Sequence, residues 1–397
     1  MKITQSLAMF IEHIKELVVD TGEQCADIAE YINVLRYKRY CKLQSKLLNM
    51  YLSHPEQHLN LIVDKLIITV AYNKKASFVF DRMAHEKHGI LNVHPSLVNK
   101  IRVKEVSVGS INNGYNKYQK TRPFYNKKYT IEVVDDEHTN VAIYVADGSE
   151  GNGIRNIRIV ETPSTSSLTS RRYIYNHLYR TLTKRCYDQL MQKARVTRVD
   201  VAVDLPHVAW FFCIFVPHNK NLKHSTCVYG DGQRDLQEVC ETFYIGKLPA
   251  ADSEKRNRAT SKYRIYCPLL AEYKGLKDIK KCGRELSTRW EYELITNDND
   301  RGLTLINLEQ AKPMLHHLKV IDPLDFHTLP ERWHKELLKD KTVCNMRRRL
   351  IYLQRRLNKS HGFNTISLDK TWLKNEQERI LNELKLDMLC PVQRGEA

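Results

Sequence analysis

The sequence lacks the motifs of several common enzyme classes. It has no Gly-x-x-x-x-Gly-Lys-Ser/Thr phosphate loop, no His-Glu-x-x-His element and no pair of histidines with one hydrophobic residue between them. Without a phosphate loop the chain is not expected to hydrolyse ATP by itself. The adjacent His316 and His317, and the pair His54 and His58, stand alone in the sequence. Such isolated histidines are more typical of structural roles than of metal ligation.

Cysteine motifs and long apolar runs are also missing. The 10 cysteines include no Cys-x-x-Cys pair and are widely spaced, so we expect reduced thiols rather than a zinc site or a disulfide scaffold. The longest apolar run, 208–216, is far shorter than the ~20 residues of a membrane-spanning helix. Residues 1–18 have no continuous apolar centre, unlike a signal peptide. We therefore expect a soluble, cytoplasmic protein with no membrane partner.

Positive charge is in clear excess. The 397 residues include 63 lysines and arginines against 46 aspartates and glutamates, a formal net charge of +17. The excess is spread over 99–129, 163–198, 251–290 and 331–397, which suits a long surface that follows a phosphate backbone. A generally basic protein without a nucleic-acid partner is the alternative. The hydrophobic content of 42% is enough for a substantial core and excludes a disordered chain.

The hydrophobic pattern divides the chain into three regions. A helical N-terminal region covers 1–60, a β-rich region covers 61–305, and a basic helical region covers 306–397. Strands are predicted at 61–71, 128–134, 141–145, 154–161, 197–205, 241–246, 262–267 and 288–295, with one helix at 170–194. Further helices are predicted at 7–18, in a stretch that ends near 52, at 343–357 and at 367–389. The predicted fold class is α+β, with a central antiparallel-rich sheet and helical flanks.

The helix predicted at 343–357 is strongly basic. Its apolar stripe consists of Val343, Met346, Leu350, Leu353 and Leu357, and its other positions include Arg347, Arg348, Arg349, Arg355 and Arg356. Because arginines neutralise phosphates without regard to base sequence, we expect these five arginines to bind duplex DNA.

Two predicted strands each present a pair of carboxylates on one face. In the strand 197–205, the two-residue period of a strand puts Asp200 and Asp204 on the face opposite to three valines. In the strand 288–295, Glu291 and Glu293 likewise point to the face opposite to Trp290, Tyr292 and Leu294. Carboxylates on one face repel one another unless a cation lies between them, and hard oxygen ligands favour Mg²⁺ or Mn²⁺. Aspartates that face solvent or pair with arginines are the alternative.

A third predicted strand carries a candidate nucleophile. Lys262, Arg264 and Tyr266 share a face of the strand 262–267, which Pro268 follows. A phenol has a pKa near 10, so a tyrosine nucleophile needs nearby positive charge or a base. Lys262 and Arg264 are placed to supply that charge. Most of the 21 tyrosines are nevertheless expected to pack in the core or lie at the surface.

Taken together, these segments resemble the replication initiation factor family, the rolling-circle initiators of small plasmids and some filamentous phages. Members show, in this order, an Asp-Lys-Leu element, an Arg-φ-Asp-φ-Ala-φ-Asp strand, a Thr-φ-Tyr-φ-Gly element, an Arg-φ-Tyr strand and an Arg-φ-Glu strand, where φ is hydrophobic. The similar segments here are 63–66, 198–204, 242–246, 264–266 and 289–291. Each is weak alone, and their shared order carries the resemblance. The chain before 60 and after 305 lies outside it.

The resemblance implies a Rep-type nicking and joining domain, divergent from the HUH nucleases, at 61–305. Tyr266 would attack origin DNA and form a 5′-phosphotyrosine link, and Arg264 and Lys262 would steady the developing charge. The implied ligands of Mg²⁺ or Mn²⁺ are Asp200, Asp204 and Glu291, with Glu293 as a further member. Arg198 would bind nucleic acid. The implied partners are origin DNA and a helicase and polymerase of the bacterial host, and the chain could form a homodimer.

One departure from the family pattern concerns the nucleophile. The family usually follows its tyrosine with an acidic or amide residue and then a lysine, whereas this chain has Cys267 and Pro268. The phosphate-contacting lysine is therefore unassigned, and Tyr263 stays open as an alternative to Tyr266. Tyr266 is preferred because Tyr263 would point away from Arg264 in a regular strand.

Two other functions remain open at this stage. A tyrosine recombinase would act without metal, and His177 with Arg180 offers a faint His-x-x-Arg element for it. That assignment would leave the carboxylate strands without a role. A non-catalytic protein that binds DNA or RNA would use the basic stretches for the backbone, and its acids would pair with arginines.

Overall fold

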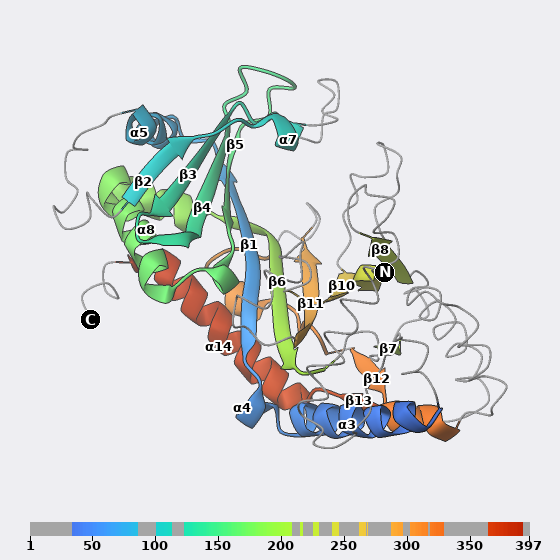
Figure 1. Cartoon of the computed structure of the whole chain (residues 1–397). Coiled ribbons are helices and arrows are strands. Elements are labelled where there is room, and N and C mark those ends of the chain that lie inside the picture. The colour runs from blue at the N-terminus through green and yellow to red at the C-terminus, as the bar shows by residue number, and fades with distance from the viewer. Residues whose placement is uncertain are drawn as a thin grey trace.

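Ten strands form the central sheet of this protein. The computed structural model describes residues 34–85, 101–112, 123–208, 215–216, 225–229, 240–245, 262–266, 268, 287–296, 302–316, 318–328 and 364–391. Within them the sheet has the order β2-β3-β4-β5-β1-β6-β11-β10-β9-β8 (Figure 1). Every neighbouring pair is antiparallel. The predicted α+β class with a large antiparallel sheet is confirmed.

The strands of this sheet are β1 (Leu61–Ala71), β2 (Ile101–Glu105), β3 (Lys127–Val133), β4 (Asp136–Ala146), β5 (Asn156–Glu161), β6 (Arg195–Pro206), β8 (Ser225–Tyr229), β9 (Cys240–Ile245), β10 (Lys262–Tyr266) and β11 (Ser287–Ile295). A small sheet joins β7 (Phe215–Val216), β12 (Lys319–Ile321) and β13 (Thr365–Ser367). The described α-helices are α3 (Val34–Ser53), α4 (Pro55–His58), α5 (Lys74–His85), α7 (Gly109–Asn112), α8 (Leu168–Leu182), α9 (Lys184–Gln192) and α14 (Lys370–Leu389). The 3₁₀ helices are η1 (Pro163–Thr165), η4 (Leu308–Gln310) and η5 (Pro323–Thr328).

All eight predicted strands are present in the large sheet, and only β4 begins more than two residues from its predicted start. The two strands that the pattern missed, β2 and β8, are the edge strands of the sheet. No residue of β2 is fully buried, and a strand that buries so little has no clear two-residue alternation to reveal it.

The single helix predicted at 170–194 is wrong, because the chain forms α8 and α9 there. Ser167 caps α8 by accepting a hydrogen bond from the backbone N–H of Ser170 at 3.1 Å. Thr183 separates the two helices with φ 66°, a conformation that β-branched residues rarely adopt. Neither glycine nor proline marks the break in the sequence, so the hydrophobic period alone could not reveal it.

The described part of the C-terminal region contains strands that the hydrophobic pattern did not predict. The strands β12 and β13 and the 3₁₀ helices η4 and η5 all lie within 306–397. Strands of three residues are too short to show a period, and these two form by pairing with each other and with β7. The predicted helix at 367–389 is confirmed as α14. The predicted helices at 7–18 and 343–357, with Arg347, Arg348, Arg349, Arg355 and Arg356, lie outside the described residues.

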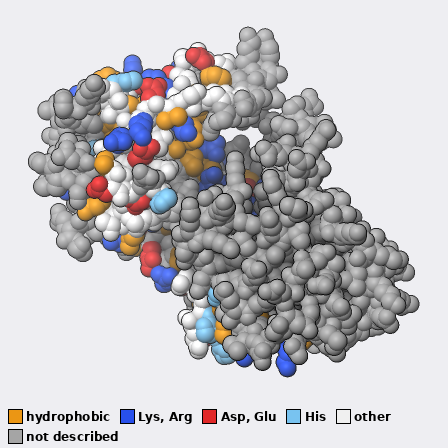
Figure 2. All heavy atoms as spheres, in the orientation of Figure 1, with side chains coloured by type: hydrophobic (Ala, Val, Ile, Leu, Met, Phe, Trp, Pro, Cys, Tyr) orange, Lys and Arg blue, Asp and Glu red, His pale blue; other side chains and the backbone are white. Residues whose placement is uncertain are grey.

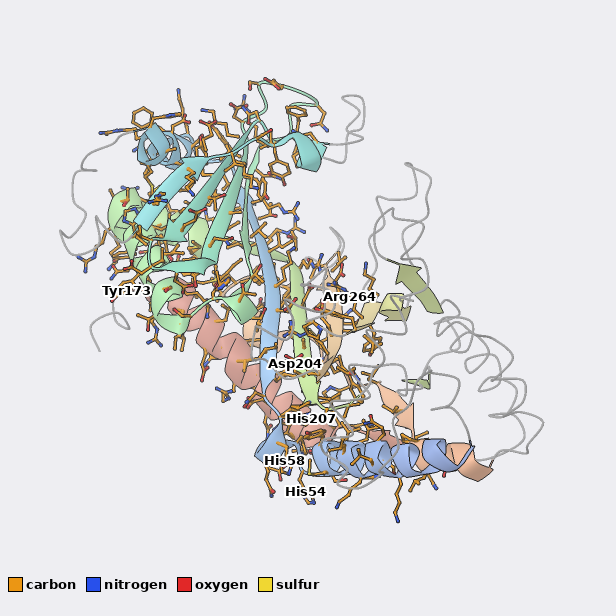
Figure 3. The ribbon with its side chains drawn as sticks, in the orientation of Figure 1. His54, His58, Tyr173, Asp204, His207 and Arg264 are labelled. Carbon is orange, nitrogen blue, oxygen red and sulfur yellow. The ribbon has the colours of Figure 1, made fainter. Side chains whose placement is uncertain are left out.

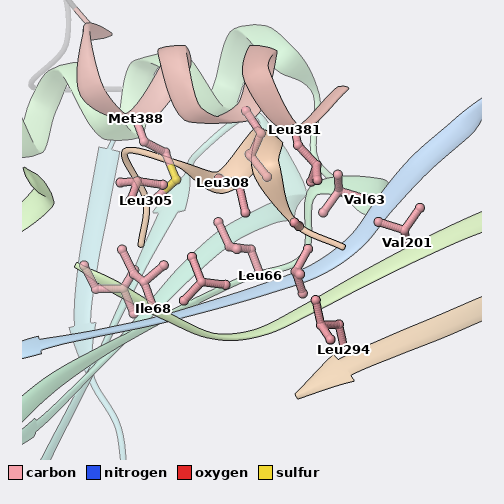
Figure 4. Packing of buried hydrophobic residues seen from close by; sticks show 14 of the residues in the cluster. Val63, Leu66, Ile68, Val201, Leu294, Leu305, Leu308, Leu381 and Met388 are labelled. Atoms are coloured by element: carbon pink, nitrogen blue, oxygen red, sulfur yellow. The ribbon is translucent and has the colours of Figure 1, made fainter. Parts of the chain in front are cut away.

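Helices cover one face of the sheet, and the hydrophobic core lies beneath them. Helix α14 runs beside β1, and α8 packs against β3 and β4 (Figure 1). In the core, Leu66 and Ile68 of β1 lie near Leu381 and Met388 of α14 (Figure 4). Within the described ranges, no helix is both long enough and apolar enough to cross a membrane. The opposite face, called the open face below, carries the polar side chains of the central strands.

A buried ion-pair network ties α8 and α14 to the sheet. Glu161 of β5 lies on the core face and is only 2% exposed. Arg171 of α8 and the hydroxyl of Tyr175 donate hydrogen bonds to its two carboxylate oxygens. Asp387 of α14 accepts a hydrogen bond from Arg172 at 3.2 Å and lies 3.8 Å from Arg171. Loss of one partner would leave a buried charge uncompensated.

Replacing Glu161 with glutamine is therefore expected to lower the free energy of unfolding by about 3 kcal/mol, because Arg171 keeps its charge and loses its nearest carboxylate. Urea denaturation measures this change. The matched control is Glu132→Gln, which breaks an exposed ion pair with Lys104 and should cost less than about 1 kcal/mol. Equal midpoint shifts for the two variants would show that the buried network does not stabilise the packing of α8.

Candidate active site

Four neighbouring strands, β1, β6, β11 and β10, bring most of the predicted site residues to the open face. The register pairs Asp204 with Arg289, Asp200 with Glu293, Glu293 with Lys262, Glu291 with Arg264, and Arg289 with Tyr266. Residues paired directly across antiparallel strands point to the same face. Figure 3 shows two of these side chains, Asp204 on β6 and Arg264 on β10, from different strands of the same sheet. The face pattern that the sequence predicted for all three strands is confirmed.

A β-bulge in β1 adds two charged residues to this face. The residues of β1 that belong to the core cluster are Leu61 and Val63 before the bulge and Leu66, Ile68 and Val70 after it, and Ile67 is buried outside that cluster. The inward positions thus change from odd to even numbers, and the register with β6 shifts between Val63 and Lys65. A bulge places an extra residue opposite one partner and redirects its side chain. Asp64 and Lys65 are therefore both available to the open face.

The hydroxyl of Tyr266 contacts a buried carboxylate. It donates a hydrogen bond to Oε2 of Glu291 at 2.9 Å, and Nη1 of Arg264 donates to Oε1 of the same carboxylate at 2.8 Å. The Arg264 guanidinium also lies 5.1 Å from the centre of the Tyr266 ring. Glu291 is 0% and Tyr266 7% exposed. The predicted nucleophile and a predicted metal ligand are thus direct neighbours.

Tyr263 lies on the other face, as predicted. It belongs to the hydrophobic core, and its ring centre is 4.7 Å from that of Tyr292. Of the two candidate tyrosines, Tyr266 is therefore the one beside the carboxylates.

Arg289 joins β11 to both β6 and β1. Its Nε and Nη2 donate hydrogen bonds to the two carboxylate oxygens of Asp204 at 2.7 Å and 2.8 Å. Its Nη1 donates to Oδ1 of Asp64 at 2.6 Å, and Asp64 also accepts from the hydroxyl of Ser164 at 2.8 Å. The planar guanidinium therefore holds two aspartates in fixed positions.

Arg198 and Lys262 pair with the remaining acids. Arg198 donates hydrogen bonds to both carboxylate oxygens of Asp200 and lies 3.2 Å from Glu293. Nζ of Lys262 lies 3.4 Å from Glu293. Arg198 is thus engaged with carboxylates in this structure, and its contact with nucleic acid stays a prediction.

Three carboxylates are close enough to share one cation. Oxygen atoms of Asp64, Asp200 and Glu291 lie within 4.8 Å of one another. Three hard anionic oxygens are a donor set that fits Mg²⁺ or Mn²⁺. Asp200 and Glu291 were predicted as ligands, and Asp64 was not. The other predicted ligands, Asp204 and Glu293, lie outside this group and are held by Arg289, Arg198 and Lys262.

A second group with metal-ligand spacing lies near the edge of the sheet, where Asp81, His85 and Glu105 come together. The carboxylate of Asp81 accepts hydrogen bonds from Lys127 and Tyr129 at 2.5 Å. His85 and Glu105 are exposed, so this cluster is explained by ordinary surface pairing.

The formal charges of the side chains in the site balance without a metal ion. Five acids (Asp64, Asp200, Asp204, Glu291 and Glu293) share it with five bases (Lys65, Arg198, Lys262, Arg264 and Arg289). Arginine pairing, the alternative to metal binding, therefore also accounts for the acids. A divalent cation would give the site a net positive charge, which a phosphate group could offset.

Burial controls the protonation of the two central groups. It raises the pKa of Glu291 to about 7, although Arg264 opposes the shift. Burial, followed by the carboxylates of Glu291 and Asp64, raises the pKa of Tyr266, and Arg289 and Arg264 only partly oppose this. Burial and the two carboxylates therefore outweigh the positive charge that was expected to favour the phenolate. The phenol stays protonated in this site, and its use as a nucleophile requires a proton acceptor.

The sequence predicted the two carboxylate strands and the tyrosine strand, and it did not predict that Asp64 joins them. The sequence gives no clear signal of it, because Ile62 and Ile67 are also apolar and hide the change of the inward positions from odd to even. Such a change of parity within one strand is typical of a bulge.

A comparison of the chain with known protein families and with curated proteins found no match.

Proposed function

We propose that this protein is a metal-dependent DNA-nicking and joining enzyme that initiates rolling-circle replication. The observation that carries the proposal is the contact between the Tyr266 hydroxyl and Glu291, beside a group of carboxylates with the geometry of a cation site. A nucleophile, a proton acceptor and hard oxygen ligands within a few ångströms are the parts that phosphodiester transfer to a tyrosine requires. The basic composition agrees with a DNA substrate.

In the proposed reaction, Oη of Tyr266 attacks the phosphorus of a phosphodiester at the origin. A bond from phosphorus to the tyrosine oxygen forms while the bond from phosphorus to the 3′ oxygen breaks. The phenol proton passes to Glu291, and the 3′ oxygen takes up a proton from solvent water and leaves as a hydroxyl that can prime synthesis. One phosphoester bond replaces another, so the strand can later be rejoined without ATP.

The surrounding cations have separate roles in this proposal. Arg264 orients the Glu291 carboxylate and lies over the Tyr266 ring, so it stabilises negative charge at both. Asp64, Asp200 and Glu291 would hold Mg²⁺ or Mn²⁺, which would draw charge from the scissile phosphate. Arg289 keeps Asp64 in place.

The direct test is to incubate the protein with a supercoiled replicon carrying a candidate origin and with Mg²⁺ or Mn²⁺. We expect nicked circles and a covalent protein–DNA adduct that survives denaturation, with both lost when EDTA is added. A nicking activity that EDTA leaves unchanged would favour a tyrosine recombinase. For that enzyme class His177 is badly placed, because it is buried in α8 on the opposite face of the sheet from Tyr266.

A non-catalytic nucleic-acid-binding protein is the second candidate. The balanced pairing of acids with arginines favours it, because a purely structural network would look the same. The adduct assay separates the two functions. DNA binding without an adduct, with either metal and with origin DNA present, would support the non-catalytic function.

A further inference from the structure

A row of polar side chains crosses the open face of the sheet away from the carboxylates. The register pairs Thr69 of β1 with Arg158 of β5, Arg158 with Tyr144 of β4, and Tyr144 with Lys128 of β3. Neighbouring strands lie about 4.8 Å apart, so the row is about 14 Å long. Lys65 lies four residues before Thr69 on β1 and is paired with Asp200, so it links the row to the candidate active site.

Arg158 adds a positive charge to the open face beyond the five bases that match the acids of the site, and Lys65 is one of those five bases. Nε of Arg158 is buried without a hydrogen-bond partner. No ion pair joins either residue to an acid within the described ranges, unlike the other basic residues around the carboxylates. A buried guanidinium nitrogen without a partner, on a face where Lys65 also has no described ion pair, suggests an absent anion.

The far end of the row is also basic and packs on aromatic rings. Nζ of Lys128 lies 5.5 Å from the centre of the Tyr144 ring, and that ring packs edge-on against Tyr125 at 5.8 Å. Tyr144 is 8% exposed, so it supports Lys128 from below. In the space-filling view, lysine and arginine side chains lie on the described surface, including beside the hollow in the middle of the view (Figure 2).

We infer that Lys65, Arg158 and Lys128 bind phosphates of a single DNA strand that continues from the candidate active site across β1, β5, β4 and β3. The inference rests on the proposed function for the identity of the polyanion. Phosphate oxygens would supply the hydrogen bond that Nε of Arg158 lacks. The contacts are to the backbone, so the row would hold any base sequence.

The experiment measures binding of a fluorescently labelled oligothymidylate to the full chain in EDTA, over a range of salt concentrations. Each lost phosphate contact on a single strand should reduce the slope of log K against log salt by about 0.7. For Arg158→Met we expect this reduction and an affinity loss of about fivefold to tenfold at moderate salt. Lys65→Met should give a similar change, and Arg158→Lys should keep most of the slope.

The matched control is Arg185→Met in α9, an exposed arginine on the helical side of the sheet, which should leave the slope unchanged. Thermal melting of each variant shows whether it folds. If Arg158→Met does not fold, Arg158→Lys is the variant that tests the row. An unchanged slope in folded Arg158 and Lys65 variants would overturn the inference.

The adduct assay is independent of this result. Oligonucleotide binding that depends on Arg158 without any adduct would refute the proposed nicking function and leave the strand path standing.

Discussion

Replacing Tyr266 with phenylalanine is expected to abolish the covalent protein–DNA adduct and to reduce nicking by at least about a thousandfold, as loss of a nucleophile does in other enzymes. The change removes one oxygen, the atom that donates to Glu291, and leaves the ring under Arg264 in place. Folding should therefore be little affected. The measurement is the yield of adduct on denaturing gels with origin DNA and Mg²⁺ or Mn²⁺.

The matched control is Tyr263→Phe, three residues earlier on the same strand. Tyr263 packs against Tyr292 in the core and points away from the carboxylates, so its variant should form adduct at close to the wild-type rate. Adduct formation by Tyr266→Phe at the wild-type level would exclude Tyr266 as the nucleophile. If Tyr263→Phe alone lost activity, the nucleophile would be on the face that this structure buries.

The sheet could be predicted from the sequence because its central strands are amphipathic. In β6, Val199, Val201 and Val203 alternate with Asp200 and Ala202, and each valine is buried in the core. Such alternation is a local property of the chain, so it survives in a single sequence. The break at Thr183 and the short strands β12 and β13 depend instead on packing between distant segments, which no local pattern records.

The same distinction applies to the candidate site. The faces of β6, β10 and β11 followed from the two-residue period, so Tyr266 and Glu291 could be expected on the same side of the sheet if their strands were neighbours. Which strands are neighbours is not a local property. The contribution of Asp64 depends on the pairing of β1 with β6 and on the bulge between Val63 and Lys65. The pairing of Arg289 with Asp204 and of Arg264 with Glu291 likewise comes from cross-strand register.

Asp64 and Asp204 provide a matched pair for testing which carboxylates bind the cation. Both accept hydrogen bonds from Arg289, and only Asp64 belongs to the group of three within 4.8 Å. We expect Asp64→Asn to weaken Mn²⁺ binding and metal-dependent nicking by at least about a hundredfold, because a neutral amide replaces an anionic ligand. Asp204→Asn should reduce both by less than about tenfold, since its effect reaches the cation only through Arg289.

Titration calorimetry with Mn²⁺ measures binding apart from catalysis, and nicking rates at increasing metal concentration measure the functional effect. Each variant removes one carboxylate from the same guanidinium, so similar losses of thermal stability are expected, and a difference in metal binding cannot be attributed to folding. If Asp204→Asn lost Mn²⁺ binding while Asp64→Asn kept it, the cation would lie with Asp200, Asp204 and Glu291, the set that the sequence predicted. If neither variant altered nicking and EDTA had no effect, the carboxylates would serve only to orient Arg198, Arg264 and Arg289 for the phosphate.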